Sequence, residues 1–263
     1  MIGEIEFPVY DVVTPQTLAE YQVRSLTYNE ELKLKASIPS ETNIISHLNR
    51  IVYDTIVKAP ERIKSYSDFL TNTTIEDRKA LIAGIYHASY GNSFVVTNVC
   101  PNCGHTLTNK ITLTKTATVN FYEGEPFSIL EVNEEVELPI SKDVFVLRYP
   151  TLQTEEFVYK YAEDQNEELL VRSTFVKEIK TGDTVLSLED NVYDIITRIG
   201  MLPAKDRRKL DSACMKMMTN SGISLKYKVI CKECSHKFVG SIDFVAQLFR
   251  MVLEWWLITY RTV

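Results

Sequence analysis

The stretches Cys100-Pro101-Asn102-Cys103-Gly104-His105 and Cys231-Lys232-Glu233-Cys234-Ser235-His236 share one cysteine spacing and one pattern of flanking residues. A Cys-x-x-Cys turn places two thiolates at the separation that two corners of a tetrahedral zinc ion require. A small residue after the second cysteine lets the chain return into a strand. The alternative is four unrelated core cysteines. The duplicated spacing favours a zinc ribbon with one structural zinc ion per chain, held by Cys100, Cys103, Cys231 and Cys234.

The two knuckles lie 131 residues apart, which is too far for the loop of an ordinary zinc ribbon. The intervening chain repeats features of the chain before the first knuckle, in the same order. At the 131-residue offset Phe7-Pro8 matches Leu138-Pro139, Gly91 matches Gly222 and His105 matches His236; with small gaps, Asp77-Arg78 matches Asp206-Arg207. We therefore predict an internal duplication whose halves each donate one knuckle to a shared zinc ion and lie about a pseudo-two-fold axis.

The predicted fold class is α+β, with two pseudo-repeated, mainly helical halves, each carrying one Cys-x-x-Cys β-hairpin knuckle, and a C-terminal helix. The predicted boundaries are 1–113 for the first repeat, 114–136 for a linker, 137–244 for the second repeat and 245–263 for the helix.

Apolar spacing and stop signals divide each half into elements. In the first half they predict a helix over 44–56, a helix from a capping-box-like Thr74-x-x-Asp77 to Gly91, and strands over 94–99 and 107–113. In the second half they predict strands over 144–149 and 225–230 and helices over 153–164, 167–179, 188–199 and 203–218.

The composition limits the class of protein. The 263 residues carry a net charge of −6 and are 45% hydrophobic and 24% charged. These values suit a globular core and argue against a dedicated nucleic-acid surface, which carries a basic excess. The chain shows no signal-peptide pattern and no run of roughly 18 apolar residues for a membrane span. Five cysteines, with Cys214 left over, suit a reducing compartment, so we expect synthesis in cytosol.

Catalytic patterns are missing from the sequence. It contains no Ser-His-Asp arrangement, no phosphate-binding glycine loop and no His-Glu-x-x-His motif. The Asp77-Arg78 and Asp206-Arg207 pairs are expected to cap helices and form ion pairs. His105 and His236 are expected outside the metal site, because four thiolates already complete a tetrahedron. A thioredoxin-like redox role does not fit, because strands flank both knuckles. We therefore predict no enzyme activity.

Basic residues gather in two places and leave one alternative function open. Lys226, Lys228, Lys232 and Lys237 surround the second knuckle, and Lys205, Arg207, Arg208 and Lys209 precede Asp211. Zinc ribbons often bind nucleic acid, so a zinc-ribbon nucleic-acid-binding regulatory protein is the alternative. The first knuckle has only Lys110 nearby and lacks stacking aromatic residues, which argues against that role.

One further pattern points to a family. A Phe-Pro segment at 7–8 precedes Val-Arg-Ser-Leu-Thr and an acidic helix start (23–31). Asp-Arg-Lys-Ala-Leu-Ile (77–82) and Ser-Tyr-Gly (89–91) then lead into Cys-Pro-x-Cys-Gly (100–104). This order resembles the baseplate hub and hub-assembly proteins of contractile-tailed bacteriophages (myoviruses). The second knuckle, Cys-Lys-Glu-Cys-Ser, departs from that form. The resemblance implies a non-enzymatic protein, made in the host cytoplasm and placed in the virion tail baseplate, that binds other baseplate or tail proteins.

The C-terminal segment is the predicted partner contact. Asp243 can cap a helix, and apolar residues from Phe244 to Trp256 then repeat on one face. That face alone is also what a core helix shows. Trp255, Trp256 and Tyr260 spread apolar groups around the axis, so we expect the helix over 243–260 to meet a protein partner. A membrane is the rival partner, but charged residues interrupt the segment and it is too short to span.

Overall fold

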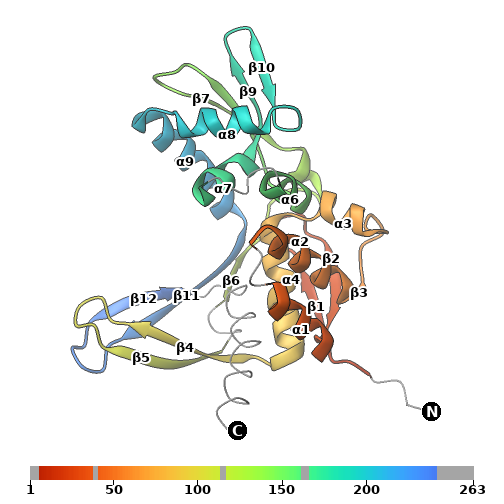
Figure 1. Ribbon diagram of the computed structural model, residues 1–263. Coiled ribbons are helices and arrows are strands. Elements are labelled where there is room, and N and C mark those ends of the chain that lie inside the picture. Colours follow the sequence, from red (N-terminus) through yellow and green to blue (C-terminus); the bar gives the residue numbers. More distant parts are fainter. Residues whose placement is uncertain (1–5, 38–40, 113–116, 161–165, 242–263) are drawn as a thin grey trace.

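The computed structural model describes residues 6–37, 41–112, 117–160 and 166–241. Figure 1 shows two lobes, one above the other, and an arm of long hairpins that projects sideways at the level of the lower lobe. All strand pairs among the described residues are antiparallel. The protein is therefore a mixed α and β fold with several small sheets.

The first lobe combines a three-stranded sheet with four helices. The sheet has the order β1 (Val9–Val13), β2 (Glu20–Arg24) and β3 (Ile56–Lys58). The helices are α1 (Tyr28–Ser37), α2 (Glu41–Asp54), α3 (Tyr66–Asn72) and α4 (Ile75–Tyr90). Helix α4 lies so close to β1 that a Cβ atom on Gly84 would overlap a methyl group of Val12. The lobe core includes the fully buried Leu81, Ile85 and Phe69.

The second lobe has a four-stranded sheet and four helices. A short 3-10 helix, η1 (Ser128–Glu131), leads into β7 (Asn133–Glu137), and the sheet has the order β10 (Thr184–Ser187), β9 (Val176–Thr181), β8 (Val144–Arg148) and β7. The helices are α6 (Leu152–Lys160), α7 (Glu167–Phe175), α8 (Val192–Gly200) and α9 (Ala204–Asn220). A separate core, with Phe145 and Ile179 at its centre, fills this lobe.

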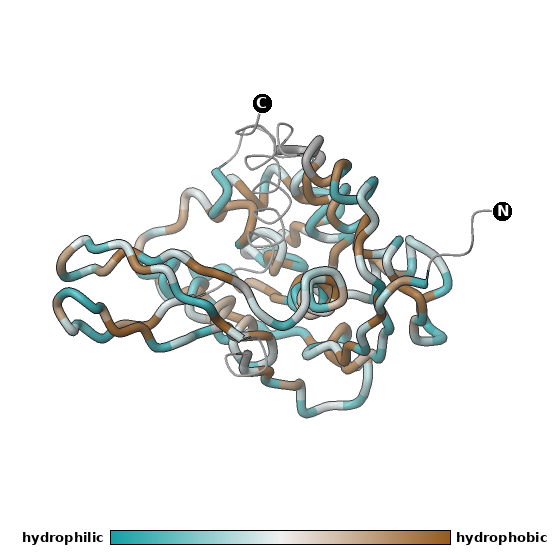
Figure 2. Tube along the Cα trace, turned by 90° about the horizontal axis from the view of Figure 1, so that it is seen from below, coloured by the Kyte–Doolittle hydropathy of each residue, from teal (hydrophilic) through white to brown (hydrophobic). Residues whose placement is uncertain are grey.

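Each lobe ends in a long helix that runs into a hairpin. Helix α4 is followed by β4 (Ser93–Val99) and β5 (Thr106–Thr112), and α9 is followed by β11 (Gly222–Ile230) and β12 (Lys237–Ser241). Both hairpins lie in the arm, and Figure 2 shows them side by side when seen from below. The strand β6 (Ala117–Asn120) pairs with the first residues of β11, so part of the predicted linker belongs to the sheet of the second hairpin.

Two buried aspartates hold equivalent places in the two lobes. Asp77, in the first turn of α4, accepts the backbone N–H of Gln16 at 2.8 Å and that of Thr17 at 3.2 Å, in the turn between β1 and β2. Asp206, in the first turn of α9, accepts the N–H groups of Ile140 and Ser141, both at 2.8 Å, in the turn between β7 and β8. In each lobe the carboxylate therefore ties the start of the long helix to the first turn of the sheet.

The sequence signals for helix ends agree with the structure where they were strongest. Thr74 and Asp77 form the predicted capping box of α4, and Gly91 ends the helix with a φ of 84°. The expected roles of the first Asp-Arg pair are confirmed, since Asp77 caps and Arg78 forms an ion pair with Glu155.

Three short strands were missed. The predicted helix over 167–179 is wrong beyond Phe175, because Val176–Thr181 is β9, in which Val176 and Ile179 are buried. β10 and β3 also lie where no strand was predicted. The predicted C-terminal helix over 243–260 lies outside the described residues. None of the helices in the described part of the chain has the length and apolar character needed to cross a membrane.

The lobes meet through a one-sided contact. Residue Arg78 of α4 forms a buried ion pair with Glu155 of α6, with a 2.9 Å bond from Nη2 to Oε1, and also donates to Asn49 of α2 at 2.7 Å. Backbone bonds from Ile75 to Pro150 and from Leu152 to Thr73 flank this pair. An exact two-fold would repeat the same contact with the lobes exchanged. Arg207, which follows Asp206 as Arg78 follows Asp77, is instead exposed.

Candidate metal centre

The two knuckles stand at the tips of the arm hairpins. β4 and β5 pair continuously from Ser93 opposite Thr112 to Val99 opposite Thr106, which leaves residues 100–105 as the connecting turn. β11 and β12 pair from Lys226 opposite Ser241 to Ile230 opposite Lys237, which leaves residues 231–236. The strands predicted on either side of each knuckle are therefore confirmed.

Both turns have the same internal hydrogen bonds. The N–H of Cys100 donates to the carbonyl of His105 and that of Gly104 donates to Cys100, both at 2.9 Å. In the second turn Cys231 donates to His236 and Ser235 donates to Cys231, again at 2.9 Å. Gly104 and Ser235 have φ angles of 71° and 58°, in the left-handed region. The residue after the second cysteine therefore makes the sharp return that the sequence predicted.

The hairpins pack against each other through their inner faces. Val96 and Leu107 of the first hairpin and Tyr227 and Val229 of the second are buried in one shared cluster. The Tyr227 hydroxyl donates to the Asn98 side chain at 2.8 Å. The arm is therefore a small two-layer packing that brings the tips together.

The four predicted cysteines converge at those tips. The Sγ atoms of Cys100 and Cys234 are 3.7 Å apart, those of Cys103 and Cys231 are 3.6 Å apart, and all four lie within 4.8 Å of one another. A tetrahedral zinc ion with Zn–S bonds of about 2.3 Å separates its sulfurs by about 3.8 Å. None of these cysteines forms a disulfide. The donor set and spacing therefore fit a tetrahedral metal ion.

The protonation of the sulfurs points the same way. The pKa of the Cys234 thiol is lowered to about 6 by hydrogen bonds from the Asn102 side chain and the backbone of His236. A backbone hydrogen bond from His105 favours the thiolate of Cys103 as well, but contacts with the other three sulfurs outweigh it and raise its pKa to about 12. Four thiolates this close together repel one another, so they do not all ionise without a counter-charge. A bound dication supplies that charge, and the thiols that coordinate it are deprotonated.

Histidine takes no part in this cluster. The metal-binding groups found among the described residues comprise only the four cysteines. His105 is exposed, with its Nε2 atom 3.9 Å from the Glu233 carboxylate on the other tip. Cys214 lies in the second-lobe core, where burial raises its pKa to about 12 and leaves it an unreactive thiol.

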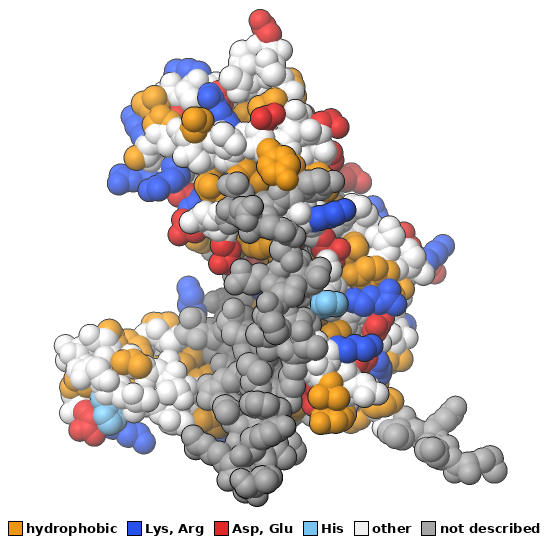
Figure 3. Space-filling model, viewed as in Figure 1, with side chains coloured by type: hydrophobic (Ala, Val, Ile, Leu, Met, Phe, Trp, Pro, Cys, Tyr) orange, Lys and Arg blue, Asp and Glu red, His pale blue; other side chains and the backbone are white. Residues whose placement is uncertain are grey.

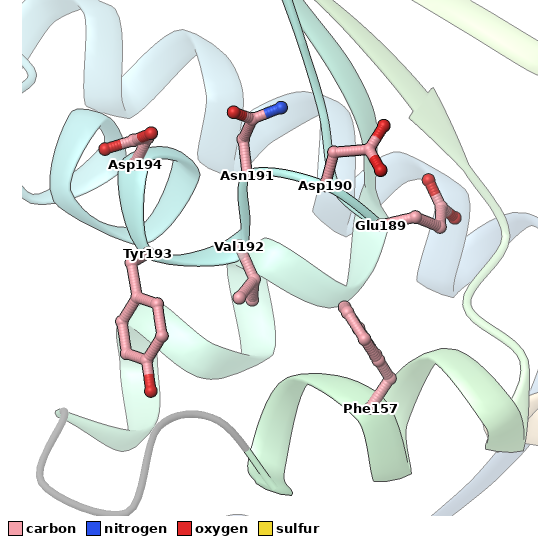
Figure 4. Close-up of a pocket in the computed structure, with 7 residues that line it drawn as sticks. All are labelled: Phe157, Glu189, Asp190, Asn191, Val192, Tyr193 and Asp194. Atoms are coloured by element: carbon pink, nitrogen blue, oxygen red, sulfur yellow. The ribbon is translucent and has the colours of Figure 1, made fainter.

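Two cavities lie elsewhere in the described structure. One of about 300 Å³ lies beside the start of α8, and Figure 4 shows the side chains of Asp190, Asn191 and Asp194 pointing in different directions rather than at one point. A second of about 430 Å³ lies between the lobes beside the Arg78–Glu155 pair. The two residues of that pair are 77 positions apart in the chain. The sequence predicted an ion pair for Arg78 but did not identify Glu155 as the partner.

Comparison with protein families gives one match, which covers most of the chain. Residues 7–250 match the family described as T4 bacteriophage base plate protein. This chain belongs to that family. In the same comparisons no individual curated protein and no solved structure gave a significant match. The resemblance to phage baseplate proteins is therefore confirmed, and membership indicates a structural component of the virion tail that contacts other baseplate or tail proteins.

Proposed function

We propose that this baseplate protein works in the hub region of a contractile tail, as a structural or assembly component that acts through protein–protein contacts. The family match over residues 7–250 carries the baseplate part of this proposal. Support for the hub region comes from the order of motifs in residues 7–113, from the Phe-Pro segment to the first knuckle.

The test is mass spectrometry of purified phage particles. We expect peptides of this chain in a fixed ratio to other baseplate proteins if it stays in the virion. Detection only in assembly intermediates would identify an assembly factor. Absence from both particles and intermediates would contradict the proposal.

The proposed role of the four cysteines is to hold one structural zinc ion. Cys100, Cys103, Cys231 and Cys234 would fill all four coordination positions and leave none for water or substrate, as in closed structural sites. Such an ion would join the tips of two hairpins and so stiffen the arm. Elemental analysis of protein purified without chelator should return one zinc per chain. One iron per chain would change the identity of the proposed metal, and protein without any metal would contradict the proposed site.

The chain organisation that we propose is a duplication, with repeats at 1–113 and 137–244 around a linker at 114–136. Its support is the shared element order from sheet to helices to long helix to hairpin, and the equivalent bonds of Asp77 and Asp206. A superposition of experimental coordinates for 70–113 and 200–244 tests it. Unlike paths of the two segments would contradict the duplication.

The proposed partner contact is the C-terminal helix over 243–260, and this proposal rests on its sequence. Trp255 and Trp256 are the two tryptophans of the chain, and large aromatic residues are frequent energetic centres of interfaces. Deletion of residues 254–263 should leave a folded protein that no longer joins its assembly. If the truncated chain unfolds, the segment belongs to the core instead.

A further inference from the structure

The start of helix α9 presents an exposed basic surface. Lys205, Arg207, Arg208 and Lys209 are all exposed, and none of them forms an ion pair with a described residue. We call these four residues the α9 basic surface. Figure 3 shows Lys and Arg side chains gathered at the left edge of the upper lobe, where α9 begins in Figure 1. In a chain of net charge −6, this local excess of positive charge needs a reason.

The first lobe shows what covers the equivalent surface there. Asp77 and Asp206 occupy the same place in their lobes, since each binds two N–H groups of the first sheet turn. Arg207 therefore corresponds to Arg78. The α4 surface around Arg78 is not exposed, because the start of α6 lies on it and supplies the carboxylate of Glu155.

The contact in the first lobe has two parts. The guanidinium of Arg78 is bound on both sides, by Glu155 and by Asn49, and the backbone bonds at Thr73 and Ile75 seat the start of α6 against the start of α4. A second acidic residue at the start of α6, Glu156, accepts from Asn49 at 2.9 Å. The first lobe thus shows what binds such a helix start, namely the acidic N-terminus of another helix.

Nothing among the described residues plays that part in the second lobe. Two methionines before and further along α9 are also exposed, Met201 to 75% and Met215 to 58%. Methionine and arginine are both enriched at protein interfaces relative to the rest of the surface. We propose that the α9 basic surface is the docking site for an acidic helix start on another protein of the tail. This inference rests on the proposed function.

The corresponding helix start of a second copy of this chain is not free to act as that partner. The counterpart of the acidic α6 start is α1, whose Glu30 is already bound by both guanidinium nitrogens of Arg24, at 2.7 and 2.9 Å. Its neighbour Glu31 accepts from the Tyr90 hydroxyl at 2.6 Å. Nucleic acid fits less well than a carboxylate-bearing protein, because the patch has four cations without stacking aromatic residues. The positive charge of the α9 basic surface and the contact between Arg78 and the start of α6 both favour an acidic protein surface as the partner.

The first test is carbodiimide cross-linking of wild-type phage tails, followed by mass spectrometry. This reagent joins a lysine amine directly to a carboxylate, so it reports only charge pairs in contact. We expect Lys205 or Lys209 to be joined to an aspartate or glutamate of another tail protein. Cross-links from both lysines only within this chain or to a second copy would overturn the inference, as would no cross-link at either lysine.

The second test replaces all four residues of the α9 basic surface by glutamine. Its matched control is Lys58, Lys64, Lys177 and Lys226→Gln, which removes four exposed cations from elsewhere. We expect both variants to melt like the wild type. Incorporation into tails, measured by complementation of a phage lacking the gene, should fall about tenfold or more for the first variant only. Equal incorporation of the two variants would overturn the inference.

The outcomes separate this inference from the proposed function. Wild-type protein that is absent from tails and their intermediates would contradict both. Wild-type protein that is present, with a first variant that enters tails normally, would contradict the docking site alone. Loss of salt-dependent binding to a 20-base-pair DNA duplex in the first variant, without any effect on incorporation, would identify nucleic acid as the ligand and overturn the protein partner.

Discussion

Replacement of Arg78 by methionine should destabilise the protein strongly, because it leaves a carboxylate buried without its cation. The Arg78 and Glu155 side chains are only 7% and 9% exposed, so water cannot take the place of either partner. Removal of one member of a buried ion pair typically costs about 3–5 kcal/mol. The carbonyl oxygen of the Asn49 side chain also loses its donor, which adds to the cost.

The double variant Arg78→Met with Glu155→Leu should be less damaged than Arg78→Met alone. The double variant leaves no buried charge without a partner. The remaining loss of stability comes from the unpaired Asn49 oxygen and imperfect packing, and is about 1–3 kcal/mol. The difference between the sum of the single variants and the double variant is then a coupling energy of about 2 kcal/mol or more. A coupling of this size would assign the stabilisation to the contact between the lobes rather than to either lobe alone.

The assay is urea unfolding followed by far-UV circular dichroism at pH 7. Lys180→Met is the control, because the Lys180–Glu135 pair is 40% and 62% exposed and should contribute about 0–1 kcal/mol. If Arg78→Met costs less than about 1 kcal/mol, or if the single effects simply add, the lobes are not held by this pair and the reasoning fails.

Three further predictions follow from the arm, the α4 packing and the α1 start. Cys103→Ser should lower the zinc content below one per chain and the melting temperature with it, whereas Cys214→Ser should keep the zinc; unchanged zinc in both would contradict the ligand set. Gly84→Ala should cost about 1–3 kcal/mol despite the better helix former, because its Cβ would meet Val12, while Gly200→Ala, with its nearest neighbour at 3.5 Å, should be neutral or slightly stabilising in thermal melts. Burial opposes ionisation of Glu30, but hydrogen bonds from Arg24 and Thr27 outweigh it and hold its pKa below 4.5. The stability that ionised Glu30 contributes is therefore complete above pH 4.5 and is lost as the pH falls through the lower folded pKa. Glu30→Gln should make the free energy of unfolding fall less steeply in acid, and an unchanged fall would refute this.

The sequence predicted best those features that depend on residues close together in the chain. The capping box at Thr74, the stop at Gly91 and the strands around each knuckle are local signals, and the structure contains all of them. The cysteine cluster could be predicted although its halves are far apart, because the repeated spacing marked both halves with the same pattern.

Features set by distant packing escaped the sequence. Residues 176–179 follow a helix without a Pro or Gly to end it, and the apolar Val176 and Ile179 are three positions apart, a spacing that fits a continuing helix. The pairing of β6 with β11 and of Arg78 with Glu155 depends on how the lobes meet, which no single stretch encodes. The missed features thus depend on tertiary pairing, either within a lobe's own sheet, as for β3, β9 and β10, or where one lobe or hairpin meets another.

The position of the cysteines in the chain has a consequence for the timing of synthesis. The second pair leaves the ribosome 128 residues after the first, since Cys231 follows Cys103 by that distance. At about 5–20 residues per second, the first pair waits roughly 6 to 26 seconds before its partners exist. During that interval only two of the four thiols have been made. They can be oxidised, or they can bind a metal ion that lacks half of its ligands. A nascent chain halted before residue 231 should therefore hold metal weakly, so that tight binding marks a protein whose second half has been made and has reached the first.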